Sequence, residues 1–401
     1  MPVSLLSSLA QPVPQGGKIL LSVLDGLGGL PDPATGKSEM ETARLPHLNA
    51  LAARSSLGLA DPVAPGITPG SGPGHLGLFG YDPLTEVIGR GALSAAGVNF
   101  PLKKGDVAAR ANFATLNAEG IITDRRAGRI PTEVCEARCA LLKGIPGVTV
   151  VPEKDHRAVV VFHPGRGKGL SPDVTDTDPQ QTGVAALACK ARSKKGASLA
   201  KHVNAFVAEA VKRLQAFPQA NGLLLRGFDV QPDLPSLESL YGLKAVALAS
   251  YPMYKGLARL AGMEIVEGLS DFPAQLEALP DALKRADFVF LHFKATDSAG
   301  EDADFVKKVR ALEAYDAAVP ALLKAGADVL VVTGDHSTPA VMGAHSWHPV
   351  PYLLHALRCR TEGVEGFHER TCARGQLGRF PLKEGMALML AHAGRLAKYG
   401  A

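Results

Sequence analysis

Three separate apolar runs in this chain each end at an aspartate, and this feature constrains the fold more than any other. Ligands of open α/β sheets bind beyond the carboxyl ends of buried parallel strands, where residues distant in sequence converge. One aspartate after a strand is as often a helix N-cap. Three of them, one followed by His336, favour a binding site. The runs are KILLSVLDG with Asp25, DFVFLHFKATD with Asp297, and DVLVVTGDH with Asp335.

The order of these runs predicts an α/β fold with a doubly wound, mostly parallel sheet and a smaller inserted α+β domain. The alternation of strand and helix opens at Lys18, breaks off, and returns near Leu237. The segment between has a different pattern, with a hairpin at VTVVPEKDHRAVVVF and a long amphipathic helix at LAKHVNAFVAEAVKRLQAF. We therefore expect residues 1–91 and 236–401 to form one domain and residues 92–235 to form the insertion.

Composition places the chain among compact cytoplasmic proteins. The 401 residues are 46% hydrophobic and 20% charged, and no apolar stretch approaches the length of a membrane span. The first ten residues lack the basic start of a signal peptide. The five cysteines are scattered and odd in number, which fits a reducing compartment. We expect Cys135 and Cys139, four apart on a predicted helix, to pack structurally.

The charge is uneven along the chain. Residues 92–235 hold 20 Lys and Arg against 13 Asp and Glu, a balance of +7, which leaves −3 for the rest of a chain with net charge +4. The basic segment lacks Lys/Arg runs interleaved with aromatics, and only 5% of the chain is aromatic. A small anionic substrate is therefore expected, with neither nucleic acid nor membrane as a partner.

The strand-tip residues supply ligands for a divalent metal. Asp335 and His336 are followed by His345 and by His348, which we expect to be solvated. Carboxylates mixed with imidazoles suit Mn²⁺, Zn²⁺ or Mg²⁺.

Asp297 leads the acidic segment DSAGEDAD. If a helix begins near Ser298, Asp297 and Glu301 stand one turn apart and can hold one ion. A solvated first turn that complements the helix dipole is the alternative. Asp302 and Asp304 lie close enough in sequence to replace Glu301.

Ser71 lies in the Gly-rich segment TPGSGPGHL, ahead of an apolar helical stretch. Amides at a helix N-terminus bind phosphate oxygens, although a serine there can be a simple cap. Beside metal ions, the Ser71 hydroxyl would have a lowered pKa and act as a nucleophile toward phosphorus. His75, four residues on, either lines the same face or packs in the core.

These motifs, in this order, resemble the alkaline-phosphatase superfamily, and specifically the cofactor-independent phosphoglycerate mutases of the archaeal type. The resemblance covers nearly the whole chain and is specific as a set, whereas TGDH alone is weak. The motifs are LDGLGGLPDP, PGSGPGHLGLFGYDP, ARANFAT, DRRAGRI, GKGLSPDVTDTDP, YPMYKGLARLAGM, HFKATDSAGEDAD and TGDHSTP with HSWHPVP.

The resemblance implies an isomerase of glycolysis and gluconeogenesis that interconverts 3-phosphoglycerate and 2-phosphoglycerate. Ser71 would take the phosphoryl group, and the other hydroxyl of a reoriented glycerate would take it back. Lys255, in the MYKG motif, would add positive charge at the phosphoryl oxygens; the alternative is a solvated loop lysine.

The resemblance also implies two divalent ions, Mn²⁺ by preference, with Mg²⁺, Zn²⁺ or Co²⁺ as alternatives. Glu301 stands where the family commonly has histidine, so the second ion is the less secure. The first ion would be held by Asp25, Ser71, Asp335 and His336, and the second by Asp297, Glu301 and His345.

The basic insertion would hold the glycerate carboxylate and exclude water, which would otherwise hydrolyse a phosphoserine. Arginine suits this task because its planar fork binds a carboxylate with two hydrogen bonds. A phosphomonoesterase or a phosphopentomutase-like enzyme is the alternative with the same metal core, and a non-catalytic anion- or metal-binding protein is the alternative of another class. The oligomeric state stays open. The substrate-binding candidates are Arg126, Arg129, Arg157, Arg226 and His75.

Overall fold

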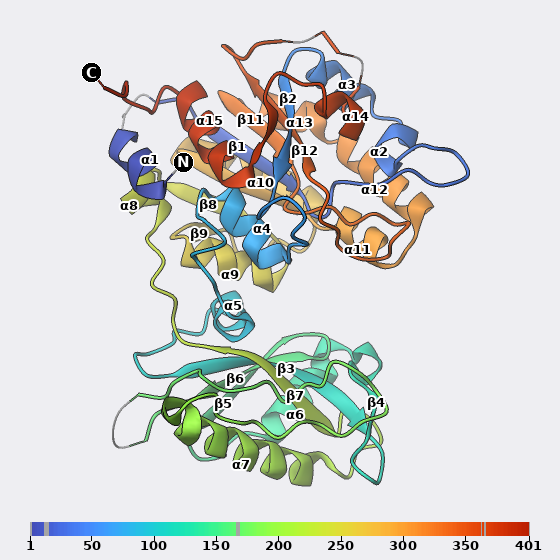
Figure 1. Ribbon diagram of the computed structural model, residues 1–401, viewed down its shortest axis with the longest axis vertical. Helices are drawn as coiled ribbons and strands as arrows, with labels where there is room; N and C mark the ends of the chain where they lie inside the picture. The colour runs from blue at the N-terminus through green and yellow to red at the C-terminus, as the bar shows by residue number, and fades with distance from the viewer. Residues whose placement is uncertain (1, 12–15, 166–168, 362, 365, 401) are drawn as a thin grey trace. The chain divides into compact units, whose positions relative to one another are not determined.

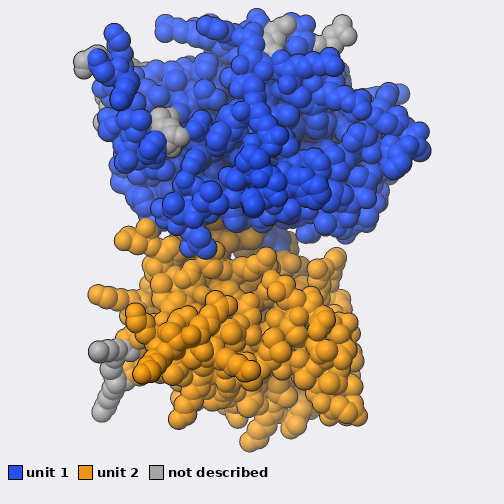
Figure 2. All heavy atoms as spheres, in the orientation of Figure 1, with its two compact units in different colours: residues 1–87, 234–251, 261–401 blue, residues 88–233, 252–260 orange. Residues whose placement is uncertain are grey.

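The computed structural model describes residues 2–11, 16–165, 169–361, 363–364 and 366–400, and the chain divides into two compact units (Figure 2). Unit 1 comprises residues 1–87, 234–251 and 261–401, and unit 2 comprises residues 88–233 and 252–260.

The short segment 252–260 is the main difference from the boundaries expected from the sequence. It forms helix α9 (Pro252–Leu260), which packs against α5 (Arg90–Gly97) within unit 2. A Cβ on Gly256 would lie 2.5 Å from the Leu93 carbonyl oxygen, so the close approach of the two helices requires glycine. Arg259 also donates from Nη1 to the carbonyl oxygens of Ala96 and Gly97.

Eight strands of the described part of unit 1 form one mostly parallel sheet (Figure 1). Their spatial order is β13-β2-β12-β11-β1-β10-β8-β9. Among these eight described strands, only the pairings of β12 with its two neighbours are antiparallel. The strands are β1 (Ile19–Leu24), β2 (Ser56–Asp61), β8 (Ala245–Leu248), β9 (Glu264–Ile265), β10 (Phe288–Phe293), β11 (Val329–Thr333), β12 (Val350–Ala356) and β13 (Gly378–Pro381).

Helices cover both faces of this sheet, which confirms the predicted doubly wound α/β fold. Alternate residues of the central strands, such as Leu20, Val289 and Leu330, pack on one side into a core with α3, α10, α12 and α13. On the other side α4 and α15 pack, and the ring of Phe79 meets Phe290 edge to face at 5.1 Å. The helices of unit 1 are α1 (Val3–Leu9), α2 (Glu39–Thr42), α3 (Pro46–Ala52), α4 (Ser71–Leu78), α8 (Leu237–Tyr241), α10 (Phe272–Arg285), α11 (Ala295–Glu301), α12 (Phe305–Asp316), α13 (Val319–Lys324), α14 (Glu369–Cys372) and α15 (Gly385–His392).

The three aspartate-tipped runs are the three central strands of this sheet. Strand β1 pairs in parallel with β10 on one side and with β11 on the other. All residues of the three strands are buried. Since parallel neighbours end at the same edge, the residues that follow β1, β10 and β11 come together there.

The described residues of unit 2 form an α+β unit built on a five-stranded sheet (Figure 1). One face of the sheet, with Ala109, Phe113 and Val160, packs on α6 and α7. The predicted hairpin and long helix are confirmed as β5–β6 and α7. The elements, besides α5 and α9, are β3 (Val107–Leu116), β4 (Ile122–Asp124), α6 (Thr132–Leu141), β5 (Val148–Lys154), β6 (Arg157–Phe162), α7 (Ala197–Leu214) and β7 (Gly222–Asp229).

None of the helices in the described ranges is both long enough and apolar enough to cross a membrane.

Candidate metal centre and active site

Asp25, Asp335 and His336 converge at the carboxyl ends of β1 and β11. All three are fully buried. The Nε2 atom of His336 lies 3.3 Å from Asp25 Oδ1 and 3.2 Å from Asp335 Oδ2. One ligand atom from each residue lies within 4.8 Å of the other two, close enough to share one ion.

A second group joins Asp297 and His345 to the same histidine. Asp297 lies in the first turn of α11, directly after β10, and is 1% exposed. The Nε2 atom of His345 lies 3.5 Å from Asp297 Oδ1, and its ring stacks on that of His336 at 3.7 Å between centroids. Asp297, His336 and His345 again offer ligand atoms within 4.8 Å. His336 therefore lies within reach of both groups.

The hydrogen bonds of Thr338 determine which nitrogen of His336 is available to a metal. The Thr338 hydroxyl donates its proton to Asp297 Oδ1 at 2.8 Å. Its contact of 2.9 Å with His336 Nδ1 must then be donated by the imidazole, because a carboxylate only accepts. That tautomer leaves Nε2 as a lone pair directed at the carboxylates. A hydrogen bond on one ring nitrogen that orients the other toward a metal is the usual arrangement around metal-binding histidines.

The charges of this group fit a divalent cation. Burial raises the pKa of Asp25, but the charge of Lys294 and the hydrogen bond and charge of His292 outweigh it and keep the carboxyl ionised. Burial holds the pKa of His336 below its ordinary value, so the imidazole is neutral. Apart from the contact of 3.2 Å with His75 Nδ1, the buried Oδ2 of Asp335 accepts no hydrogen bond within the described residues. Carboxylate oxygens that face a nitrogen lone pair at 3.2–3.3 Å need a cation between them.

Ser71 reaches this group from the first turn of α4. Its Oγ lies 3.2 Å from His336 Nε2. Gly70 is the N-cap residue with extended backbone, so Ser71 is a helical residue and does not cap the helix with its side chain. One turn on, a Cβ at Gly74 would lie 2.2 Å from the Asp335 carbonyl oxygen. The glycine therefore lets α4 approach the strand tip that carries the metal ligands.

His75 is not placed to contact a substrate, which corrects its predicted role. Its side chain is fully buried, with Nδ1 at 2.8 Å from the Ser71 carbonyl oxygen and 3.2 Å from Asp335 Oδ2. Burial lowers the pKa of His75, but the charge of Asp335 and its hydrogen bond raise it above the ordinary value. The ring packs edge to face on Phe290. His75 therefore contacts both Ser71 and Asp335 from the protein interior.

Lys294 is a site residue that the sequence interpretation missed. Its Nζ lies 2.9 Å from Asp25 Oδ2 and 2.5 Å from Asp297 Oδ2, and its side chain is 29% exposed. It is the N-cap residue of α11, at the turn that follows β10. A lysine between a strand and its tip aspartate, in the segment HFKATD, was the available signal.

Glu301 lies at the rim of the second group. Helix α11 begins at Ala295, so Asp297 and Glu301 stand one turn apart. The Oε1 atom of Glu301 lies 3.7 Å from His345 Nε2, and the side chain is 58% exposed. Asp302 binds Lys307 at 2.9 Å, and Asp304 caps α12. His348 stacks on Trp347 and lies outside both groups.

Unit 2 carries a cluster of arginines on the sheet face opposite α6 and α7. Arg110 on β3 pairs directly with Arg226 on β7, and Asn112, two residues along, pairs with Arg157 on β6. Since side chains two apart share a face, these groups project on the same side. The pKa of Arg90 is lowered by desolvation and by the like charges of Arg226 and Arg157.

His156 brings the remaining predicted arginines into the same neighbourhood. Burial, followed by the charges of Arg157, Arg126, Arg110 and Arg129, lowers its pKa to about 4. Arg126 and Arg129 are exposed on the loop after β4. The predicted arginines therefore share one electropositive region, to which the structure adds Arg90, Arg110 and His156.

Buried Asp178 positions Arg226 within this cluster. Its Oδ2 lies 3.6 Å from Arg226 Nη1, and it binds Arg125 through two hydrogen bonds of 2.7 and 3.1 Å. The Arg125 guanidinium is therefore bound to a carboxylate of the protein itself. Lys255 lies on α9 of unit 2, whereas Ser71 and the metal ligands belong to unit 1.

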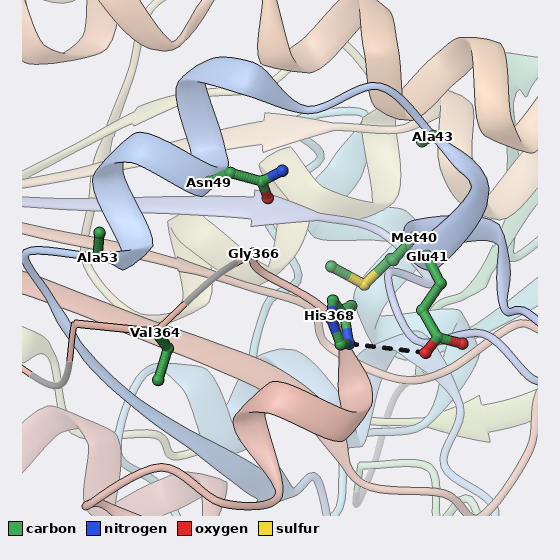
Figure 3. A pocket seen from close by; sticks show the side chains of 8 residues that line it. All are labelled: Met40, Glu41, Ala43, Asn49, Ala53, Val364, Gly366 and His368. Atoms are coloured by element: carbon green, nitrogen blue, oxygen red, sulfur yellow. Dashed lines mark ion pairs between the residues drawn. The ribbon is translucent and has the colours of Figure 1, made fainter.

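A surface hollow of unit 1 lies apart from these residues (Figure 3). Glu41 lines it next to His368, with Oε1 at 3.9 Å from His368 Nδ1 and 2.8 Å from Arg370 Nη1. None of the predicted site residues lines it, and we assign it no chemistry. It is lined by Met40, Glu41, Ala43, Asn49, Ala53, Val364, Gly366 and His368.

Comparisons with known proteins agree on one family. Residues 52–220 match the family model described as 2,3-bisphosphoglycerate-independent phosphoglycerate mutase. A Thermus thermophilus protein described as a probable enzyme of that name is 50% identical over 405 residues, covering 99% of this chain and 98% of that protein. A Deinococcus radiodurans protein with the same description is 48% identical and covers 96% of each.

Two solved structures share the fold over nearly the whole chain. The PH0037 protein from Pyrococcus horikoshii aligns with a TM-score of 0.82 at 30% identity, over 96% of this chain and 100% of that one. The cofactor-independent phosphoglycerate mutase from Thermoplasma acidophilum aligns with a TM-score of 0.67 at 29% identity, over 94% of this chain and 100% of that one.

Proposed function

Since the chain belongs to the family of 2,3-bisphosphoglycerate-independent phosphoglycerate mutases, we propose that it interconverts 3-phosphoglycerate and 2-phosphoglycerate through a phosphoserine at Ser71. The observation that carries this proposal is the position of Ser71 Oγ, 3.2 Å from His336 Nε2. There the hydroxyl stands at a helix N-terminus beside ligands for a cation, and both features favour reaction with a phosphoryl group. The other hydroxyl of the glycerate then takes the phosphoryl group from Ser71.

Two divalent ions complete this site in the proposal. Asp25, Ser71, Asp335 and His336 would hold one ion, and Asp297, His345 and Glu301 the other. Mn²⁺ suits this mixture of carboxylate, hydroxyl and imidazole ligands. When bound, such ions lower the pKa of a coordinated hydroxyl and neutralise charge on phosphoryl oxygens.

Lys294 supplies a fixed positive charge at the same place. Its Nζ lies between Asp25 and Asp297, and with ions bound to those carboxylates it is available to phosphoryl oxygens. Lys294 therefore offers, within unit 1, the same kind of positive charge that the resemblance expects of Lys255. The charge that the resemblance places on Lys255 at the phosphoryl oxygens stays a prediction.

The arginine cluster of unit 2 is assigned to the carboxylate and hydroxyls of the glycerate. Arg157 and Arg226 are only partly buried, so an anion has access to them. Retention of glycerate is what distinguishes a mutase from a phosphatase, because free glycerate leaves the phosphoserine to hydrolysis. We assign the reaction to the cytoplasm, which agrees with the lack of disulfides among the described residues.

The test supplies 3-phosphoglycerate to protein loaded with Mn²⁺ and measures 2-phosphoglycerate and free phosphate together. The proposal expects 2-phosphoglycerate as the dominant product, and loss of turnover in EDTA that Mn²⁺ restores. Dominant release of phosphate would instead assign the chain to phosphomonoesterases. Turnover that survives complete chelation would contradict the metal site.

A further inference from the structure

The ammonium group of Lys308 is completely buried beneath the metal-binding edge of unit 1. It comes from the first turn of α12 and is 0% exposed. Its Nζ donates hydrogen bonds to three backbone carbonyl oxygens, at 3.0 Å to Gly26, 3.0 Å to Gly28 and 2.8 Å to Thr338. Three acceptors match the three donors of an ammonium group, so its hydrogen-bonding capacity is filled without water.

Those carbonyls belong to the two loops that carry the first set of predicted metal ligands. Gly26 directly follows Asp25, and Thr338 lies two residues after His336. The loops also bond to each other, since the Thr338 amide donates to the carbonyl oxygens of Gly26 and Gly28. The contact is close enough that a Cβ on Gly26 would lie 2.5 Å from Thr338 Oγ1. Lys308 connects the two loops through its hydrogen bonds to carbonyl oxygens of both.

Thr338 connects Lys308 to both groups of ligands. Its carbonyl accepts from Lys308, while its hydroxyl donates to Asp297 and accepts from His336 Nδ1. A shift of the Thr338 backbone therefore moves the hydrogen bond that sets the His336 tautomer and the one that orients Asp297.

We propose that Lys308 is a positioning residue for the metal centre: it ties the loops after β1 and β11 together and thereby holds the ligand atoms in metal-binding geometry. The inference rests on the proposed function, since it concerns the same ions. Lys308 itself touches neither ion nor substrate; it acts through the backbone of Gly26 and Thr338.

Glu39 balances the charge of Lys308. Its Oε1 lies 3.8 Å from Lys308 Nζ and accepts from the Ala340 amide at 2.7 Å. Glu39 is also fully buried. Replacing Lys308 alone would leave this carboxylate without its cation, which is costly in a buried site. Loss of stability alone would therefore not establish a positioning role.

The experiment compares Lys308→Met with a matched control on the same helix. Asp316, at the end of α12, is buried and accepts from the amides of His47 and Leu48 at the start of α3, away from the metal loops. Asp316→Ala therefore breaks an equally buried anchor of α12. For each variant, the free energy of unfolding is measured in EDTA, and the Mn²⁺ dissociation constant is measured by titration of folded protein.

The expected result is a Mn²⁺ dissociation constant raised about 10- to 100-fold by Lys308→Met, the range for loss of a group that orients metal ligands. Asp316→Ala is expected to leave it within about twofold of wild type at a similar loss of stability. Equal weakening in both variants, or an unchanged dissociation constant in Lys308→Met, would overturn the inference.

A second variant keeps the test decisive if Lys308→Met does not fold. The double variant Lys308→Met with Glu39→Gln removes both buried charges and is expected to regain stability. It still lacks the three donors, so its Mn²⁺ affinity should remain weak; wild-type affinity in this variant would refute the inference. Failure of wild-type protein to bind Mn²⁺ would overturn the proposed function itself, which separates the two failures.

Discussion

The metal-ligand group of unit 1 and the arginine cluster of unit 2 are opposite in charge and in construction. The carboxylates of Asp25, Asp297 and Asp335 are at most 1% exposed and come from the ends of adjacent parallel strands. The arginines are exposed or half-buried and come from antiparallel strands, a loop and the start of α5. One region gathers negative charge where water is excluded, and the other gathers positive charge where an anion has access.

This difference separates a permanent ligand from a transient one. Buried ionised carboxylates are stable only with a cation that stays, because their desolvation is otherwise uncompensated. Half-exposed guanidinium groups keep part of their hydration and release an anion easily. A mutase of the proposed kind needs both, with ions retained through every cycle and a phosphoglycerate product that is released at its end.

The largest expected effect is on the unit 1 side of this contrast. Ser71→Ala removes the proposed nucleophile, and we expect turnover to fall by at least about 10⁴-fold. The fold should remain, since Ser71 does not cap α4 with its side chain. Mutase assays and thermal melts of the same preparation check both statements. Appreciable mutase activity in this variant would exclude a phosphoserine route.

A smaller effect is expected in unit 2. Arg157→Ala should raise KM for 3-phosphoglycerate about 10- to 100-fold, from loss of a charged hydrogen bond of about 1.5–3 kcal/mol. The share of phosphate in the products should also rise, because glycerate is held less firmly. Steady-state kinetics with product analysis measure both.

Arg213→Ala is the matched control for this arginine. Arg213 lies on α7, behind the other sheet face, and binds Glu209 at 2.7 Å. Its removal should leave KM unchanged. A similar rise in KM for both variants would mean that net charge, rather than the cluster, attracts the substrate.

Substitution of Glu301 tests whether this exposed carboxylate is a ligand of the second ion. Because its side chain is 58% exposed, we expect Glu301→Ala to loosen one of two Mn²⁺ equivalents by no more than about fivefold, or about 1 kcal/mol. Isothermal titration resolves the two equivalents. Asp302→Ala, which removes a neighbouring carboxylate bound to Lys307, should leave the titration as in wild type. An identical titration for Glu301→Ala would show that Glu301 is not a ligand.

The smallest expected effect concerns His156, and it is an effect on the pH dependence of stability. Burial and the surrounding arginines lower its pKa from 6.5 to about 4. The unfolded chain then takes up a proton first as pH falls, so the stabilisation is present above pH 6.5 and is lost toward pH 4, at roughly 1–3 kcal/mol.

NMR titration of the His156 ring measures this pKa directly. Added 3-phosphoglycerate should raise it, because a bound anion offsets the arginine charges. His156→Gln should flatten the dependence of stability on pH between 4 and 6.5. A midpoint near 6.5 without substrate would mean that the arginines do not surround this histidine.

The sequence alone was sufficient to predict the central strands of the sheet and the residues that follow them at its edge. A buried parallel strand is continuously apolar, and the aspartate that ends it interrupts the run, so Asp25, Asp297 and Asp335 stand out without coordinates. Their convergence follows from the shared direction of parallel neighbours. Ser71 and His345 were identifiable by their motifs.

Only the tertiary structure decided which residues of neighbouring elements contact those site residues. The position of Lys294 between two carboxylates, the burial of His75, and the contact of Lys308 with Thr338 depend on how helices pack. Periodicity marks the packed face of a helix but does not identify the residues that this face contacts. Arg110 joined the arginine cluster through strand register, which side-chain pairing between distant segments determines. Residues within one strand and its turn can be read from local pattern, whereas contacts across elements arise only when the chain is folded.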